Sequence, residues 1–195
     1  HAAGGTIASA TDVARFLIAQ LNQGNVDGKQ VFPADIISKS HEKLATNNLS
    51  FNDFVRKGYA WGWYIGPYKG EEMYHHFGGV AGTHSHASFI PEHNVGLVVL
   101  NNESRVSSTL TNAIADIAYS ILLKQGDGEK KANQHIQYME NMWPKNQEKI
   151  NTALKRKAQR SADRVMELSL PKSQYSGQFY HELWGELVID LLPSN

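Results

Sequence analysis

The stretch HHFGGVAGTHSHASFIPEHNVGLVVLNN, residues 75–102, contains the pattern that decides the fold of this chain. It places two strand-like runs, THSHASFIP at 83–91 and VGLVVLNN at 95–102, on either side of a short polar segment. Two such runs joined by a few residues predict an antiparallel hairpin. The second run is apolar almost throughout, which predicts that both of its faces are covered.

Strand character extends upstream of this hairpin. The aromatic-rich runs YAWGWYIG at 59–66 and EEMYHHFGG at 71–79 are separated by Pro-Tyr-Lys-Gly, which is typical of a turn. We therefore interpret Tyr59 as the start of a core strand.

Three helices are expected around these strands. The first covers about residues 12–23, with Ser9 or Thr11 as its N-cap. A short second helix begins at Pro33, where a first helical turn tolerates proline. A third covers about residues 107–123. Its apolar positions form one stripe that we expect to be buried: Leu110, Ile114, Ile117, Ile121 and Leu122.

The composition is that of a globular protein. Of the 195 residues, 41% are hydrophobic and 19% charged, and 19 basic residues balance 19 acidic ones. A zero net charge gives no support for nucleic-acid binding, which usually requires a basic face. The absence of cysteine excludes thiolate catalysis, disulfides and sulfur-ligated zinc in this chain. No apolar run is long enough to cross a bilayer.

The sequence changes character after Lys124. Residues 125–170 are polar, and we expect a partly helical linker broken at Pro144. Its basic run, LKRKAQRSADR, is interpreted as a solvated helix face. Residues 171–195 return to strand character and are expected to begin a small appended β domain.

The histidines of the opening stretch suggest a metal site as one hypothesis. In a strand, His84 and His86 point to the same face. Imidazoles can hold zinc when a water or a carboxylate completes the site. Few further ligands lie nearby in the sequence, and no His-Glu-x-x-His helix is present. We therefore keep a metal protein only as the least favoured hypothesis and expect no cofactor.

The glycines of the same stretch suggest a catalytic strand edge. Gly78 and Gly79 weaken a strand unless a ligand or another backbone approaches closely there. Serine acyl-transfer enzymes need such an approach, because a backbone N–H must meet the developing oxyanion. His76, directly before the glycines, could orient the substrate or assist proton transfer. From spacing alone, a glycine bulge with a packed histidine is an equal alternative.

Several blocks of this sequence resemble one enzyme superfamily. HFGGVAG, a Pro after eight intervening residues and HNVGLVVLNN resemble a stretch usually written His-Thr-Gly-Gly-x-x-Gly-Phe, then strand, Pro turn and GVVVLSN. Upstream, AAGGTIASATDVARFLIAQLNQG is similar to PAGGLYSTAEDMARWLLALLNGG, and YAWGWYIG to YGLGWFV. These blocks, over residues 1–124, resemble those of the serine β-lactamase and penicillin-binding-protein-like superfamily, in its class C, esterase and D-aminopeptidase-like branch.

The resemblance implies roles for five residues of the opening stretch. His76, Phe77 and Gly78 match the third motif of the superfamily, with His76 in place of the commoner lysine. Gly79 matches the position whose backbone N–H forms half of the oxyanion hole. Phe77 and Gly82 match substrate-binding positions. Phe77 replaces the usual Thr or Ser, and this loss of a hydroxyl argues against classical penicillin recognition.

The resemblance also implies a fold and a position in a longer protein. The fold is α/β (α+β): a mostly antiparallel sheet of three or four strands flanked by helices, here as a partial domain. The chain matches the C-terminal half, so we expect it to associate with the missing N-terminal half or with itself. The implied substrate is a small molecule or peptide. A periplasmic or extracytoplasmic location is an expectation from resemblance alone.

The nucleophile is the remaining question. The superfamily uses Ser-x-x-Lys, in which the lysine accepts the serine proton. The literal match here, Ser40 to Lys43, lies downstream of the helix expected at about residues 12–23. The motif of the superfamily lies upstream of the corresponding helix. We expect Ser40 not to be catalytic. The sequence therefore predicts the C-terminal part of a serine hydrolase acting on a lactam, peptide or ester. A catalytically inactive binding or regulatory module is the alternative.

Overall fold

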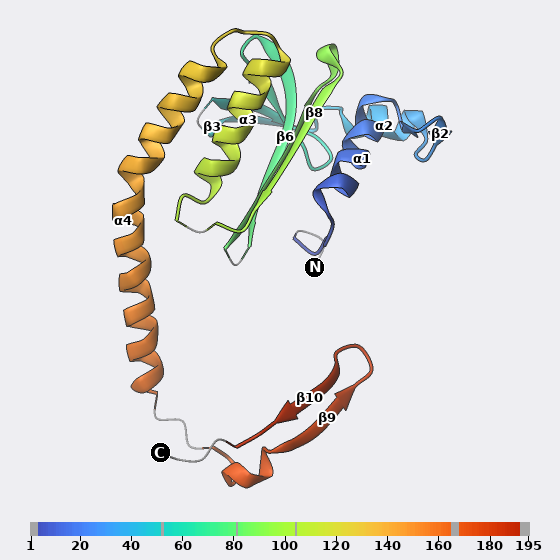
Figure 1. The fold of residues 1–195 in the computed structure, drawn as a ribbon. Coiled ribbons are helices and arrows are strands. Elements are labelled where there is room, and N and C mark those ends of the chain that lie inside the picture. Colours follow the sequence, from blue (N-terminus) through green and yellow to red (C-terminus); the bar gives the residue numbers. More distant parts are fainter. Residues whose placement is uncertain (1–3, 52, 81, 104, 165–167, 192–195) are drawn as a thin grey trace. The chain divides into compact units, whose positions relative to one another are not determined.

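The fold was analysed in a computed structural model that describes residues 4–51, 53–80, 82–103, 105–164 and 168–191. The chain divides into two compact units, His1–Ile150 and Asn151–Asn195. The first unit contains one main sheet with helices on both of its faces (Figure 1). This confirms the expected α/β architecture, a largely antiparallel sheet flanked by helices in a partial domain.

The main sheet has six strands, each paired antiparallel with its neighbour in the sequence. Their bounds are β3 (Ala45–Phe51), β4 (Phe54–Tyr59), β5 (Tyr64–Tyr68), β6 (Glu71–Val80), β7 (Thr83–Ile90) and β8 (Val95–Asn101). The expectation of three or four strands was too low, because β3 and β4 were missed. β3 is a mostly exposed edge strand containing Asn47 and Asn48, which strands disfavour. Tyr59 ends β4 rather than starting a core strand.

Short connections fix the register of the central strands. β5 continues through Pro67 and Tyr68, so its turn to β6 consists of Lys69 and Gly70 alone. Both turn residues have positive φ, as the type I′ turn of a two-residue hairpin requires. β7 and β8 are joined by the short helix η1 (Pro91–His93) and form the predicted hairpin.

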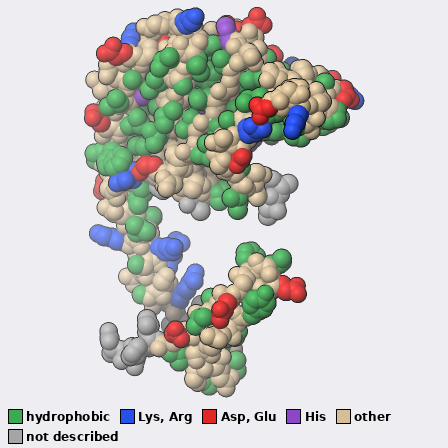
Figure 2. All heavy atoms as spheres, turned by 45° about the vertical axis from the view of Figure 1, so that its right-hand side comes forward, with side chains coloured by type: hydrophobic (Ala, Val, Ile, Leu, Met, Phe, Trp, Pro, Cys, Tyr) green, Lys and Arg blue, Asp and Glu red, His purple; other side chains and the backbone are tan. Residues whose placement is uncertain are grey.

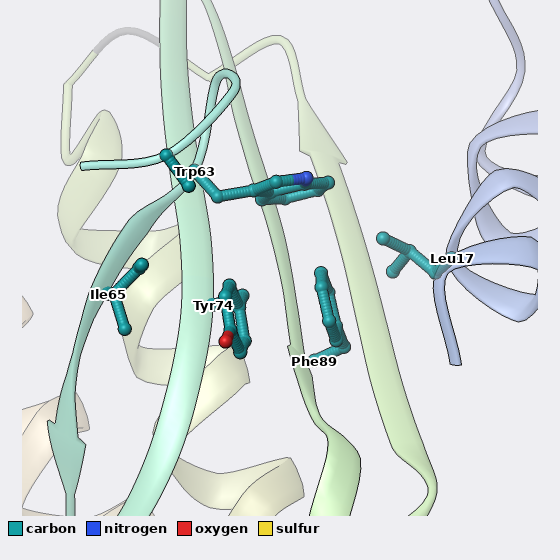
Figure 3. Close-up of a cluster of buried hydrophobic side chains, with 6 residues drawn as sticks. Leu17, Trp63, Ile65, Tyr74 and Phe89 are labelled. Carbon is teal, nitrogen blue, oxygen red and sulfur yellow. The ribbon is translucent and has the colours of Figure 1, made fainter. Parts of the chain in front are cut away.

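One face of the sheet is covered by α1 (Ala10–Leu21), whose N-cap is Ser9. Leu17 of α1 joins a buried aromatic cluster with Trp63, Tyr74 and Phe89 (Figure 3). The Phe89 ring stacks on Tyr74 and meets Trp63 edge to face, both at 5.0 Å between centroids. Burying each such ring stabilises the fold by about 1.5–3 kcal/mol. We call this side the α1 face.

Smaller elements follow α1 in the sequence. They are the hairpin of β1 (Asn25–Val26) and β2 (Lys29–Gln30) and the helix α2 (Ala34–Ser40), which begins after Pro33 as predicted.

The opposite face is covered by α3 (Ser108–Leu122), within the predicted range. Tyr119 packs there against Tyr68, beside Phe54 and Met73. We call this side the α3 face. The predicted buried stripe was wrong, because Ile114, Ile121 and Leu122 are 41%, 66% and 46% exposed. The buried side of α3 is instead formed by small or polar residues and one tyrosine: Thr111, Asn112, Ala113, Ala115, Asp116, Tyr119 and Ser120.

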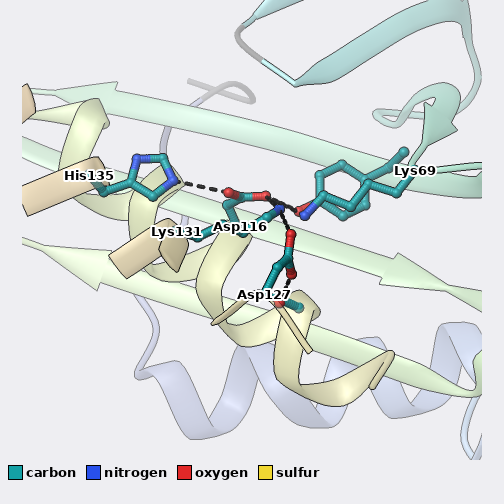
Figure 4. Close-up of polar contacts among 7 residues, drawn as sticks. Lys69, Asp116, Asp127, Lys131 and His135 are labelled. Carbon is teal, nitrogen blue, oxygen red and sulfur yellow. Dashed lines mark hydrogen bonds and ion pairs between the residues drawn. The ribbon is translucent and has the colours of Figure 1, made fainter. Parts of the chain in front are cut away.

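The polar face of α3 is explained by the groups that it meets. Asp116 is 4% exposed, and its carboxylate accepts a hydrogen bond of 2.5 Å from the Tyr68 hydroxyl. Lys69 and Lys131 each approach it to 2.8 Å and His135 to 3.0 Å (Figure 4). Burial alone would raise the pKa of Asp116, but hydrogen bonds from Lys69, Tyr68 and His135 lower it. A buried charge needs such partners, so this face of α3 cannot be apolar.

Lys131 and His135 lie on the long helix α4 (Gly128–Ala162), which corrects the expected break at Pro144. Proline removes one N–H donor, and in an exposed helix water can satisfy the carbonyl left behind. The basic run on the second half of α4 is exposed, as predicted (Figure 2). The predicted domain boundaries at 124 and 170 stay predictions.

After α4 the chain forms η2 (Lys172–Gln174) and a hairpin of β9 (Gly177–His181) and β10 (Gly185–Ile189). The predicted return to strand structure is thus confirmed. Among the described residues, every helix is too short or too polar to cross a membrane.

Candidate active site

The C-terminal end of β6 has a free backbone edge. Pairing between β5 and β6 ends at Tyr64 and His75, whereas pairing between β6 and β7 continues to Val80 and Thr83. The backbone of residues 76–80 therefore has no strand partner on the β5 side among the described residues. Unpaired N–H groups along such an edge are available to a ligand. The register is regular here, which removes the alternative of a glycine bulge.

Strand alternation divides the histidines between the two faces of the sheet. His76 lies on the α1 face, because Tyr74 two residues earlier belongs to the aromatic cluster under α1. His75 lies on the α3 face, as does Met73. In β7, His86 is paired with Phe77 and shares the α3 face with it.

A groove opens on the α1 face at this free edge. It has a volume of about 900 Å³ and lies between the segment before α1 and the ends of β6, β7 and β8. An adjoining cavity of about 510 Å³ extends toward Phe16, Trp61 and Trp63. Four predicted site residues line the groove: His76, Phe77, Gly78 and Gly79. Gly82, with φ of 87°, lies in the turn between β6 and β7 and is not among the lining residues.

His76 is held at the groove by aromatic contact. Its ring stacks on Tyr64 with 5.5 Å between centroids. Desolvation lowers the pKa of His76, a backbone hydrogen bond with Phe77 raises it, and the nearby Arg56 charge lowers it, with a net downward shift. The imidazole is therefore neutral at neutral pH and can accept a proton. This differs from the lysine common at this position, which brings a fixed positive charge.

The two glycines of the edge are each covered by a cross-strand neighbour. A Cβ on Gly78 would lie 2.5 Å from the Ser85 hydroxyl oxygen, and a Cβ on Gly79 would lie 3.1 Å from the His84 ring. The direction at Gly79 is therefore toward His84, which also lines the groove. Glycine at 78 leaves room for the Ser85 side chain on the groove side.

The α3 face below the groove is filled by rings. Phe77 lies between His75 and His86, with 5.1 Å and 4.7 Å between ring centroids. Its side chain thus points away from the face that carries His76, and its assignment to substrate binding stays a prediction. Desolvation lowers the pKa of His75 to about 3 and that of His86 to about 4.

His86 belongs to a buried hydrogen-bond chain. Its Nδ1 lies 3.3 Å from Asn112 Oδ1 and its Nε2 2.7 Å from Ser88 Oγ. Ser88 Oγ is in turn 2.8 Å from the Tyr119 hydroxyl. His86 and Ser88 are both 0% exposed. This chain joins β7 to α3 and is closed to a substrate.

Two other features of the sequence are His84, which also lines the groove, and the pair Ser40 and Lys43. His84 Nε2 lies 2.8 Å from Ser107 Oγ, and no three His, Asp or Glu side chains of the described residues gather where a metal could bind. The Ser40 hydroxyl donates to the Ile37 carbonyl at 2.7 Å. Lys43 lies beyond the end of α2, so Ser40 and Lys43 do not share a helix.

Sequence reasoning missed Ser85 and the segment before α1 as groove residues. For Ser85 a signal was present, because the hairpin places it opposite Gly78 on the same face. For the segment before α1, nothing in its composition indicates a lining role.

The sequence pattern of the family described as Beta-lactamase matches residues 1–119. The chain belongs to the beta-lactamase family. Among solved structures, it is similar to the octameric penicillin-binding protein homologue from Pyrococcus abyssi, with 25% sequence identity and a TM-score of 0.50. The match covers 60% of this chain and 24% of that protein, so the chain spans about a quarter of its length. No curated protein matches this chain.

Membership of the beta-lactamase family confirms the resemblance carried by the glycine-histidine stretch. The matched residues include the free edge of β6 and the groove beside it, but end before α4. The matched residues therefore contain the whole of the main sheet.

Proposed function

We propose that this chain is the C-terminal part of a serine hydrolase that forms an acyl-serine intermediate on a lactam, peptide or ester. The observation that carries the proposal is the unpaired β6 edge at residues 76–80, which opens on a groove beside the neutral imidazole of His76. Such an edge is what acyl transfer requires for its oxyanion. The nucleophile and its base are supplied by a part of the protein outside these 195 residues.

Each groove residue has a defined role in this proposal. The backbone N–H of Gly79 contributes half of the oxyanion hole. His76 exchanges a proton with the reacting groups, which is consistent with its lowered pKa. Gly78 keeps the edge accessible, and Phe77 anchors the strand through its contacts with His75 and His86.

The missing hydroxyl at residue 77 bears on the kind of substrate. A neutral imidazole and a phenyl ring provide no fixed positive charge for the carboxylate of a penicillin. An esterase-like or peptidase-like activity is therefore favoured over that of a dedicated β-lactamase.

The exposed apolar side chains of α3 support association as part of this proposal. Ile114, Ile121 and Leu122 form an apolar surface that water disfavours. We assign it to contact with the remaining part of the same protein or with a second copy. The similar Pyrococcus abyssi protein is described as octameric. Light scattering after size exclusion, with and without Ile121→Lys, measures whether this surface causes self-association.

The activity is tested by intact-mass measurement after labelling. The 195-residue chain and the longer polypeptide that contains it are each treated with a fluorophosphonate and with a labelled penicillin. We expect a fluorophosphonate adduct on the longer polypeptide alone. An adduct on the short chain at Ser40 would overturn the assignment of the nucleophile. No adduct on either would favour the inactive binding module, for which the Phe77 substitution is the supporting observation.

A further inference from the structure

Ser85 is placed on the wall of the groove by the register of the sheet. It is paired with Gly78, and His76 is paired with Ala87, so Ser85 and His76 occupy adjacent pairs on the same face. Its hydroxyl covers Gly78, within 2.5 Å of the position that a Cβ would take. Diagonal neighbours in a sheet are about 7–8 Å apart, so one substrate group can contact both side chains.

The Ser85 hydroxyl is free to bind a ligand. It has no hydrogen-bond partner among the described residues, although the residue is half-buried. The nearest hydroxyl on the same strand, that of Thr83, already donates to the Val80 carbonyl at 2.6 Å. The Ser88 hydroxyl is engaged in the buried chain on the α3 face. A half-buried hydroxyl without a protein partner can hydrogen-bond to water or to a ligand.

The walls that this chain contributes to the groove carry no formal charge. Among the described residues that line the two adjoining cavities there is no Lys, Arg, Asp or Glu. These walls instead contain apolar and aromatic side chains: Ile7, Phe16, Trp61, Trp63, Val98 and Leu100. A free carboxylate placed against them would lose its hydration without gaining a cationic partner from them, which is costly. An uncharged acyl chain would bury apolar surface instead.

From these observations we infer that Ser85 is a substrate-binding residue that hydrogen-bonds an acceptor oxygen of an uncharged acyl substrate. Its hydroxyl lies on the face that carries His76, whereas the Phe77 side chain lies on the opposite face. The aromatic wall holds the acyl chain, and the substrate class is an ester or amide of an apolar acid without a free carboxylate. This inference rests on the proposed function.

The test uses the longer polypeptide and two matched esters. One is p-nitrophenyl butyrate, and the other is p-nitrophenyl hydrogen glutarate, whose acyl chain is of similar size but ends in a carboxylate. We expect kcat/KM to be at least about 10-fold higher for the butyrate. Ser85→Ala is expected to lower kcat/KM for the butyrate by about 10-fold, mainly through KM, as for the loss of one neutral hydrogen bond.

Two control variants keep this result interpretable. Ser85→Thr keeps a hydroxyl at a strand position that favours β-branched residues, and it is expected to retain activity within about 3-fold. Ser50→Ala removes an exposed hydroxyl from β3 and is expected to leave both esters unaffected. Circular dichroism of each variant checks that the fold is kept.

The outcomes separate this inference from the proposed function. An enzyme that is acylated by the fluorophosphonate, but in which Ser85→Ala has wild-type KM or the glutarate is the better ester, overturns the inference alone. A folded wild-type protein that neither forms an adduct nor hydrolyses either ester overturns both.

Discussion

The two faces of the β6 and β7 strand pair use the same residue types for opposite purposes. On the α3 face, His75, His86 and Ser88 are buried, and the ring nitrogens of His86 are both engaged. On the α1 face, His76 and Ser85 border an open groove, and the Ser85 hydroxyl has no partner among the described residues. Residue type therefore does not identify the site. The face that each residue occupies does.

The cause of this difference is the layer that covers each face. α3 brings Asn112 and Tyr119 to His86 and Ser88, so that the polar groups of His86 and Ser88 are satisfied inside the protein. α1 covers only the part of its face near Phe89 and leaves the end of β6 open. Polar groups on the α3 face thus contribute to stability, whereas those on the α1 face are available for binding.

The largest effect on stability is expected at Asp116, on the α3 face. Asp116→Ala leaves Lys69 and Lys131 without their shared buried carboxylate, and removing one partner of a buried ion pair costs about 3–5 kcal/mol. Urea unfolding measures this loss. The exposed Asp35, whose nearest Lys39 contact is 3.9 Å, is the matched control, and Asp35→Ala should cost under about 0.5 kcal/mol. Equal effects of the two variants would contradict the assignment.

As the pH is lowered, the α3 face should lose stability at pH values above those at which carboxylates become protonated. The folded-state pKa values of His75 and His86, about 3 and 4, lie below the ordinary value of 6.5. The stability that neutral burial of each imidazole contributes is full above pH 6.5. It falls as the pH drops from 6.5 toward 4, by up to about 1.4 kcal/mol per pH unit and group. We expect a loss of about 2–3 kcal/mol between pH 6.5 and 5, measured by urea unfolding.

A variant of His75 sharpens this pH prediction. His75 Nδ1 has no hydrogen-bond partner in the described structure, and His75 Nε2 accepts only a long bond of 3.4 Å from Arg56 Nε. His75→Phe therefore removes one titrating group and, of the hydrogen bonds, only this long one. The slope of stability against pH should fall to about half of its wild-type value. An unchanged slope, or a wild-type stability that is flat between pH 6.5 and 5, would show that these imidazoles are not held neutral by burial.

The smallest effect is expected at Gly79. Because a Cβ there would meet the His84 ring at 3.1 Å, Gly79→Ala should cost only about 1 kcal/mol of stability, through displacement of that ring. His84→Ala in the same chain should remove the contact, so the two changes together should cost less than the sum of their separate effects. Thermal unfolding of the single and double variants measures this coupling. Strictly additive effects of the two changes on stability would contradict a contact between a Cβ at residue 79 and the His84 ring.

Sequence reasoning found the free edge but not the whole groove. His76, Gly78 and Gly79 stand in one contiguous motif, so a local pattern was sufficient to place them at the site. Ser85 required the register of a hairpin, and residues 4–8 required tertiary packing, which no local pattern contains. The α3 stripe was wrongly expected to be buried for a related reason. Hydrophobicity predicted burial of Ile121, but the sheet presents polar groups that require Asp116 and Asn112.

The different roles of the two sheet faces are tested most directly by measuring two quantities on two variants of the longer polypeptide, His76→Ala and His86→Ala. The quantities are the rate of fluorophosphonate acylation and the free energy of unfolding. His76→Ala should lower acylation by about 10²-fold and unfolding free energy by under about 1 kcal/mol. His86→Ala should lower the unfolding free energy by about 2–4 kcal/mol, because it leaves a cavity and removes the hydrogen bonds that Asn112 and Ser88 make with the ring. Where it is folded, it should acylate at close to the wild-type rate. An unchanged acylation rate in His76→Ala, or a greater loss of stability there than in His86→Ala, would contradict the division of the two faces.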